Sequence, residues 1–188
     1  DQRRYVGCYY ILHLHYVCLS SRRQESPGSH DVRVYPGKLW NHLECSVVMK
    51  SIYLIGSLRN PVVPLLGNSL RAKGWDIFDD WYGAGEEADD KWREYEQLRG
   101  RSYIEALKGY AAQHVFNFDL THLQRCSTAV LVYPAGKSGN LEFGFFRGLG
   151  KPGYILLDKD YDRWDVMLNF ATDVFFSPEE LVNALSQT

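Results

Sequence analysis

Short apolar runs alternate with longer amphipathic stretches along the chain from residue 49 onward. The short runs predict strands at residues 51–55, 75–78, 128–133, 153–157 and 173–176. Apolar residues at three- and four-residue spacing predict helices at residues 61–73, 140–149 and 102–124, the last with a break around Phe116 and Asn117. Residues 82–101 are polar and charged, which indicates a loop followed by a solvated helix.

The last helix has a clear start signal. Ser177 is expected to cap it, with Pro178 at its first position and Glu180 completing a capping box. Its predicted buried residues are Leu181, Val182 and Leu185.

Strands separated by helices predict an α/β protein. The expected fold is flavodoxin-like (Rossmann-like), an open parallel five-stranded sheet with helices on both faces. Such sheets bind ligands beyond the carboxyl ends of their strands. The segments expected there are residues 56–60, 79–81, 134–142 and 158–162.

Residues 1–48 lack this regular pattern. The apolar segment 5–19 is too short to span a membrane, and residues 20–31 read as a loop. We interpret residues 1–48 as an N-terminal extension that is not part of the core, and residues 49–188 as the functional domain. The alternative is that residues 5–19 add a strand or helix to that domain.

Composition narrows the classes of partner. The 188 residues carry a formal net charge of −2, which argues against a nucleic-acid polymer as ligand and favours a small molecule. The cysteines form no CxxC pair and no even framework of disulfides, so neither a metal site nor a secreted setting is expected. We therefore expect a cytoplasmic protein without a membrane partner.

Glu142 stands out as a carboxylate among apolar residues, just after a glycine-rich turn. One interpretation is a capping residue in the first turn of a helix, paired with Gly139. The other is a nucleophile, because a carboxylate at a strand-end cleft can attack an anomeric carbon and hold the sugar as an ester. Exposed helix N–H groups would favour its ionised form and the apolar flank would oppose it.

Two further segments carry candidate chemistry. The turn from Gly56 to Asn60 offers N–H groups, the hydroxyl of Ser57 and the guanidinium of Arg59, which together suit a small phosphate. The alternative interpretation is an ordinary strand-to-helix turn with a surface arginine. Asp119, on a predicted helix, is expected either in solvent or in the cleft, and His122 could share its face.

The segments IYLIGSLRN (residues 52–60) and FDLTHLQRCSTAVLVYPAGKSGNLEFGFFRGLGKPGYIL (residues 118–156) together resemble the nucleoside 2-deoxyribosyltransferase family. This family includes a branch that hydrolyses nucleoside 5′-monophosphates at the N-glycosidic bond. The resemblance implies Glu142 as nucleophile, Asp119 as the group that holds the sugar or assists the leaving base, and Tyr53 as the residue that orients the glutamate. It also implies a homodimer or higher homo-oligomer whose sites neighbouring subunits often complete.

The resemblance further implies that Ser57, Arg59 and Ser138 hold a 5′-phosphate. The turn before Glu142 lacks the aspartate of many transferases and carries Lys137 instead, which favours a phosphate-bearing substrate. The acidic segment 79–100 is expected to form a lid that recognises the base, with a solvated loop as the alternative. Asp79, Asp80 and Trp81 are its candidates for contacts with the base, by hydrogen bonding and stacking. The remaining expected substrate-binding residues are Gly56, Gly139 and Asn140.

The function expected from these residues is cleavage of the N-glycosidic bond of a nucleoside or its 5′-monophosphate, by hydrolysis or by transfer of the sugar, with no cofactor. A binding module that holds a nucleotide or an NAD-derived ligand without turnover is the alternative. A flavodoxin-like redox protein is a third class, but no phosphate loop of that kind follows the first strand.

Overall fold

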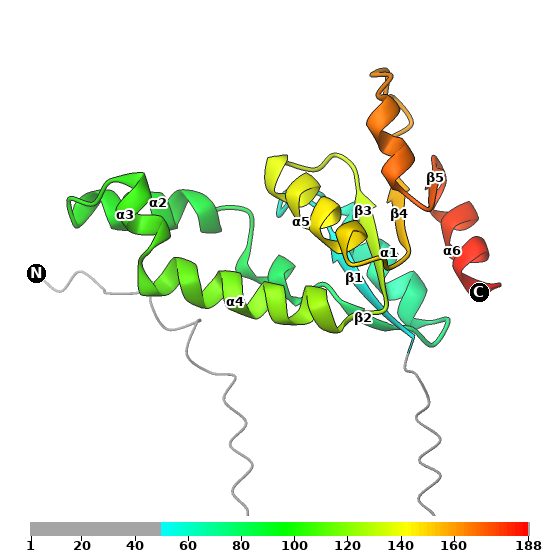
Figure 1. The fold of residues 1–188 in the computed structure, drawn as a ribbon, viewed down its shortest axis with the longest axis horizontal. Coiled ribbons are helices and arrows are strands. Elements are labelled where there is room, and N and C mark those ends of the chain that lie inside the picture. The colour runs from blue at the N-terminus through cyan, green and yellow to red at the C-terminus, as the bar shows by residue number, and fades with distance from the viewer. Residues whose placement is uncertain (1–49, 188) are drawn as a thin grey trace, which may run out of the picture. The chain divides into compact units, whose positions relative to one another are not determined.

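The computed structural model of the chain describes residues 50–187 (Figure 1). Five parallel strands form one sheet in the order β2-β1-β3-β4-β5. Their bounds are β1 (Ser51–Ile55), β2 (Asp76–Phe78), β3 (Thr128–Val132), β4 (Gly153–Leu156) and β5 (Asp173–Phe175). This order is that of flavodoxin-like folds and confirms the predicted fold class. The expectations for residues 1–48 lie outside the described residues.

Two pairs of helices cover the two faces of the sheet (Figure 1). Side chains alternate along each strand, so Ile52 and Leu54 of β1 face one helix pair while Tyr53 and Ile55 face the other. The first pair is α1 (Val62–Arg71) and α6 (Pro178–Ser186). The second pair is α4 (Tyr110–Arg125) and α5 (Lys137–Gly148). Each face therefore has its own hydrophobic core.

The insert between β2 and α4 is helical. It comprises η1 (Asp80–Ala84), α2 (Ala88–Leu98) and α3 (Tyr103–Leu107). A break at Lys108 and Gly109 separates α3 from α4, so the expected break around Phe116 and Asn117 was wrong. The physical reason is local: Ser102 and Glu105 form a capping box that starts a separate short helix, and Gly109 then caps α4 with an extended backbone.

The start of α6 confirms the predicted cap. The backbone N–H of Glu180 donates to Ser177 Oγ at 3.4 Å, with Pro178 in the first turn. The return bond of a capping box, from the backbone N–H of Ser177 to the Glu180 carboxylate, is not formed, and the Ser177 hydroxyl donates to Glu179 Oε2 at 2.6 Å. The three residues expected on the buried side of this helix are buried: Leu181, Val182 and Leu185.

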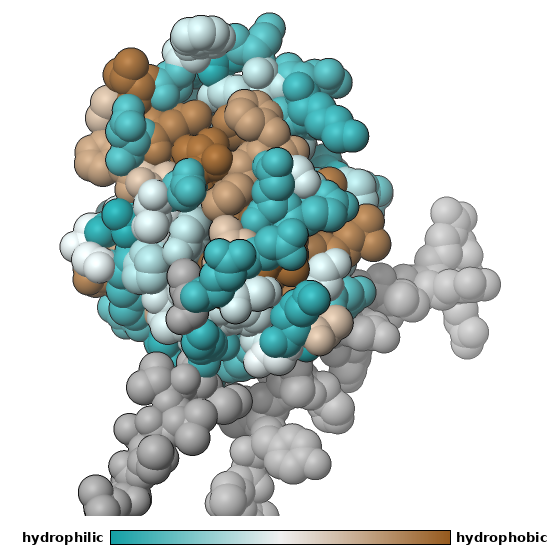
Figure 2. Space-filling view, turned by 90° about the vertical axis from the view of Figure 1, so that its right-hand side faces the viewer, coloured by the Kyte–Doolittle hydropathy of each residue, from teal (hydrophilic) through white to brown (hydrophobic). Residues whose placement is uncertain are grey.

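A short helical turn, η2 (Val166–Phe170), joins β4 to β5 and buries none of its residues. Figure 2 looks at the side of the molecule that carries this segment and α6, and hydrophobic residues gather on its upper part. Exposed hydrophobic residues of η2 are Val166, Met167 and Phe170. Across residues 50–187, no helix combines the length and apolar character that crossing a membrane requires.

Candidate active site

The loops after β1 and β3 lie together at the carboxyl edge of the sheet because the two strands are neighbours. Asn60, only 2% exposed, joins these loops. Its amide nitrogen donates to the carbonyl oxygens of Val132 and Pro134, each at 3.4 Å, while its Oδ1 accepts from the backbone N–H of Val62 at 3.0 Å. Asn60 was not among the expected site residues. The sequence signal that could have identified it is an asparagine directly before a predicted helix, which is typical of a helix cap.

Glu142 lies in the second turn of α5, not the first. The helix begins at Lys137 with Gly136 as its N-cap, three residues earlier than expected, so the interpretation of Glu142 as a cap paired with Gly139 was wrong. Gly139 instead permits close packing, since a Cβ there would meet Ile55 Cγ2 at 3.2 Å. Its small size brings the start of α5 against β1 and β3, and this approach places Glu142 over the face that carries Tyr53.

Three candidate catalytic groups come together on this face. Burial raises the pKa of the Tyr53 phenol, and the negative charges of Glu142 and Asp119 raise it further, so both carboxylates lie within electrostatic reach of its hydroxyl. Burial and then the charge of Asp119 raise the pKa of Glu142 to about 7. Burial raises the pKa of Asp119 to about 6. The apolar flank thus outweighs any effect of the helix start on Glu142.

Neither carboxylate is neutralised by a neighbour within residues 50–187. No ion pair or hydrogen bond in this part of the chain involves Glu142, and Asp119 Oδ1 is buried without a hydrogen-bond partner. The Tyr53 hydroxyl likewise makes no hydrogen bond to either carboxylate in the described residues. Both residues are half-buried, and carboxylates that lose solvent without gaining a partner are costly in a folded protein and are typical of functional sites.

An aromatic cluster adjoins these groups. Phe78 of β2 lies 4.9 Å from the Tyr53 ring and stacks on His122 at 3.9 Å between ring centroids. Phe118 packs beside His122 at 4.7 Å. Burial lowers the pKa of His122, which favours its neutral form, and its Nδ1 is buried without a hydrogen-bond partner. His122 therefore belongs to the wall of this face and not to an ion pair with Asp119.

The predicted phosphate-binding residues lie in the loops at the carboxyl edge. The backbone N–H of Arg59 donates to Ser57 Oγ at 3.2 Å, which closes the turn after Gly56. The Arg59 guanidinium donates to Asp90 of α2 at 3.0 Å. Ser138 is exposed in the first turn of α5, next to Lys137.

Asn140, expected to bind substrate, links two parts of the same edge. Its Oδ1 accepts from the Tyr133 hydroxyl at 3.0 Å, and its amide nitrogen donates to the Gly136 carbonyl at 2.9 Å. Tyr133 in turn packs edge-on against Tyr161 of the loop after β4, at 5.5 Å between centroids. The tyrosine and the asparagine hold the turn before α5 in place.

The three residues expected to recognise the base lie in different surroundings. Trp81 lies over the end of β1: its indole N–H donates to the Leu54 carbonyl at 2.8 Å, and its ring is 3.7 Å from where a Cβ on Gly56 would stand. Asp79 is buried and turned toward α1, where its carboxylate pairs with Arg71. Asp80 is exposed in η1. Of the three, Trp81 lies beside the turn that follows Gly56.

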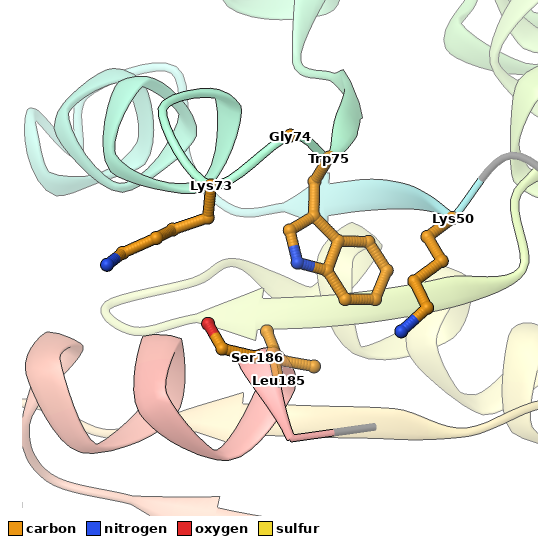
Figure 3. A pocket seen from close by; sticks show the side chains of 6 residues that line it. All are labelled: Lys50, Lys73, Gly74, Trp75, Leu185 and Ser186. Atoms are coloured by element: carbon orange, nitrogen blue, oxygen red, sulfur yellow. The ribbon is translucent and has the colours of Figure 1, made fainter.

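A pocket lies at the opposite, amino edge of the sheet (Figure 3). It has a volume of about 220 Å³, and Trp75 lies between the ammonium groups of two lysines in the view of Figure 3. Its lining residues are Lys50, Lys73, Gly74, Trp75, Leu185 and Ser186. None of the predicted site residues lines it. No cluster of histidine, cysteine and carboxylate side chains in residues 50–187 could hold a metal ion.

Comparison with known proteins finds similarity to solved structures, at sequence identities of 13% and 17%. No protein-family model matches the chain, and no curated protein matches it. Among solved structures, a conserved protein from Enterococcus faecalis V583 matches with a TM-score of 0.51 and 13% identity, over 74% of this chain and 98% of its own. At that identity the match supports the fold alone.

Two further matches carry the names that the sequence resemblance anticipates. A 2-deoxyribosyltransferase from Bacillus psychrosaccharolyticus matches with a TM-score of 0.49 and 17% identity, over 71% of this chain and 90% of its own. The CMP N-glycosidase BcmB from Clostridium botulinum matches with a TM-score of 0.46 and 13% identity, over 73% and 98%. The chemistry of this chain is therefore argued from its own side chains.

Proposed function

We propose that this protein cleaves the N-glycosidic bond of a nucleoside or its 5′-monophosphate through a covalent glycosyl–Glu142 intermediate. The observation that carries the proposal is the pair of half-buried, unpaired carboxylates, Glu142 of α5 and Asp119 of α4, whose charges both act on Tyr53 of β1. A carboxylate suits attack on an oxocarbenium-like carbon. The strand-end loops supply hydroxyl, amide and guanidinium groups that suit a phosphate.

The reaction proceeds in two steps. In the first, a Glu142 carboxylate oxygen bonds to C1′ while the C1′–N bond breaks, and its electron pair leaves with the base. Asp119, whose pKa of about 6 leaves it largely ionised wherever Glu142 is ionised, accepts a hydrogen bond from the sugar hydroxyl, and the base takes its proton from water. In the second step, water or another base attacks C1′ and releases a proton to solvent, the ester bond breaks, and Glu142 returns as a carboxylate.

Burial of Glu142 serves this scheme. Its pKa of about 7 means that the ionised form is present at neutral pH but poorly solvated, with no hydrogen bond to satisfy it within residues 50–187. The positive charge that develops on the sugar ring supplies the missing partner in the transition state. The site therefore interacts more strongly with the transition state than with the ground state.

The test is a panel of nucleosides and nucleoside 5′-monophosphates incubated with the purified full chain, followed by detection of free base. We expect base release from at least one member, and its loss in Glu142→Ala. Adding a second free base separates transfer, which gives an exchanged nucleoside, from hydrolysis. Full activity of Glu142→Ala on the same substrate would remove the proposal.

A binding module without turnover is the second candidate, favoured by one observation. The Arg59 side chain is 58% exposed, so an anionic ligand can reach its guanidinium whether or not a reaction follows. Retention of an intact nucleotide with no base release in the panel would favour this candidate. The hydroxyl of Tyr53 and both carboxylates would then act only as ligands.

We further propose that the chain acts as a homo-oligomer in a reducing, cytoplasmic setting. Apolar side chains on the insert and on α4 are exposed, including Tyr103 at 68%, Tyr110 at 86% and Phe116 at 58%. Burial of such residues is a common driving force for subunit association. Light scattering coupled to size exclusion should give a mass of at least two chains, and Tyr110→Glu should lower it.

A further inference from the structure

The guanidinium expected to bind the 5′-phosphate is engaged by a carboxylate of the helical insert. Arg59 Nη2 donates to Asp90 Oδ2 at 3.0 Å. The other oxygen of Asp90 lies 3.0 Å from Nη2 of Arg93, one turn further along α2. Asp90 therefore lies between two guanidinium groups, one from the turn after β1 and one from its own helix.

We propose that Asp90 is a positioning residue that acts through Arg59 and sets how strongly the site favours a phosphorylated ligand. Its carboxylate and the ligand's phosphate compete for the same guanidinium. The inference rests on the proposed function, because a phosphate site at Arg59 is part of that proposal. A free nucleoside offers no competing anion, so Asp90 affects only ligands that carry the phosphate.

The geometry makes this exchange easy. The side chains of Arg59 and Asp90 are 58% and 44% exposed, and ion pairs at such exposure contribute little to stability. A phosphate dianion is a stronger partner for a guanidinium than a single carboxylate. Because Arg93 keeps its contact with Asp90, the exchange leaves no carboxylate without a cation. The charge of Asp90 then remains close to the bound phosphate and opposes it.

Asp89 provides a matched control. Asp89 and Asp90 both lie in the first turn of α2, where a negative charge favours the helix start. Asp89 makes no ion pair within residues 50–187, whereas Asp90 makes two. Comparing Asp90→Asn with Asp89→Asn therefore separates the effect on Arg59 from the loss of a charge at the helix terminus.

The experiment is calorimetric titration of the full chain and its variants with ribose 5-phosphate, with ribose as the unphosphorylated probe. We expect Asp90→Asn to bind ribose 5-phosphate about two- to five-fold more tightly than the wild type, the range set by an exposed ion pair. Binding of ribose should not change. Asp89→Asn and Asp90→Glu should resemble the wild type, and Arg59→Gln should abolish the effect of Asp90→Asn.

Unchanged or weaker binding of ribose 5-phosphate by Asp90→Asn overturns the inference, as does an equal gain in Asp89→Asn. Base release measured on the same proteins separates this failure from failure of the proposed function. If the wild type releases base but Asp90→Asn keeps the same ratio of kcat/KM for monophosphate and nucleoside, the inference fails and the function stands. If no protein releases base while Asp90→Asn binds ribose 5-phosphate more tightly, the function fails and the inference stands.

Discussion

The two faces of the sheet are formed by the same strands, but one carries a hydrophobic core and the other also carries the candidate catalytic residues. On the face covered by α1 and α6, Ile52 and Leu54 of β1 belong to a hydrophobic core that also includes Leu66 and Leu181. On the face covered by α4 and α5, the charges of two half-buried carboxylates act on the intervening residue Tyr53. Strand alternation thus lets β1 supply a dry core to one side and a polar site to the other.

This difference indicates where stability and function reside. A carboxylate that loses solvent without gaining a partner destabilises a folded protein, and the α4 and α5 face holds two that are half-buried, Asp119 and Glu142. The buried carboxylate that lies against α1, Asp79, is instead paired with Arg71. Substitutions on the two faces should therefore have opposite effects on activity and on stability.

The largest expected effect is that of Glu142→Ala on the rate. Without a covalent nucleophile, base release should fall about a thousand-fold or more, which corresponds to roughly 4 kcal/mol of transition-state stabilisation. The protein should stay folded, because the side chain makes no hydrogen bond or ion pair within residues 50–187. Single-turnover base release and circular dichroism measure the two effects. A rate within ten-fold of the wild type would contradict the assignment.

The opposite pattern is expected for Leu181→Ala on the other face. Leu181 is fully buried against the sheet. Its truncation should lower the free energy of unfolding by about 3 kcal/mol, from lost burial and the cavity that remains. At a temperature where the variant is folded, its rate per folded molecule should match the wild type. A specific loss of rate in the folded variant would show that the two faces are not separable.

The sequence was sufficient to predict the sheet, and it singled out the candidate carboxylates, whose roles stay a prediction. Apolar runs gave the strands to within a residue or two, because parallel strands buried on both faces need such runs. It could not fix the balance of forces on Glu142, because that balance depends on how Gly136 and Gly139 start α5 three residues early and on how close Asp119 approaches.

Two ion pairs between separate elements of the fold could not be predicted from the sequence either. Asp79 was expected to contact the base of the substrate, but its carboxylate pairs with Arg71. Gly67 on α1 leaves room for this pair, because a Cβ at that position would overlap the Asp79 carboxylate. The contact of Arg59 with Asp90 joins residues 31 positions apart. Charge patterning within one helix predicts pairs at three- and four-residue spacing, and it carries no signal for such pairs.

The next prediction concerns the pH dependence of stability. The folded pKa of Glu142, about 7, lies above its ordinary value of 4.5, so between these values the native state retains a proton that the unfolded chain loses. The free energy of unfolding should therefore fall as pH rises from about 4.5 to 7 and then level.

Glu142→Gln removes this contribution, while the core of the opposite face is unchanged. Its stability relative to the wild type should grow by roughly 1–3 kcal/mol between pH 5 and pH 8, since one pKa unit corresponds to about 1.4 kcal/mol and the partly exposed group is screened. Urea unfolding at a series of pH values measures the difference. Parallel curves for the two proteins would mean that Glu142 is well solvated in the folded state.

The smallest expected effect tests the coupling between the two carboxylates. Base release requires ionised Glu142, so the rate of the wild type should rise with pH through about 7 and level above it. Asp119→Asn removes the charge that raises the pKa of Glu142, while burial, the larger cause, remains. The residual rate of this variant should therefore rise at a pH lower by less than about one unit. Asp89→Asn, whose charge lies on the insert, should leave the profile where it is. A profile that stays in place or moves to higher pH in Asp119→Asn would show that the two carboxylates do not interact across this face of the sheet.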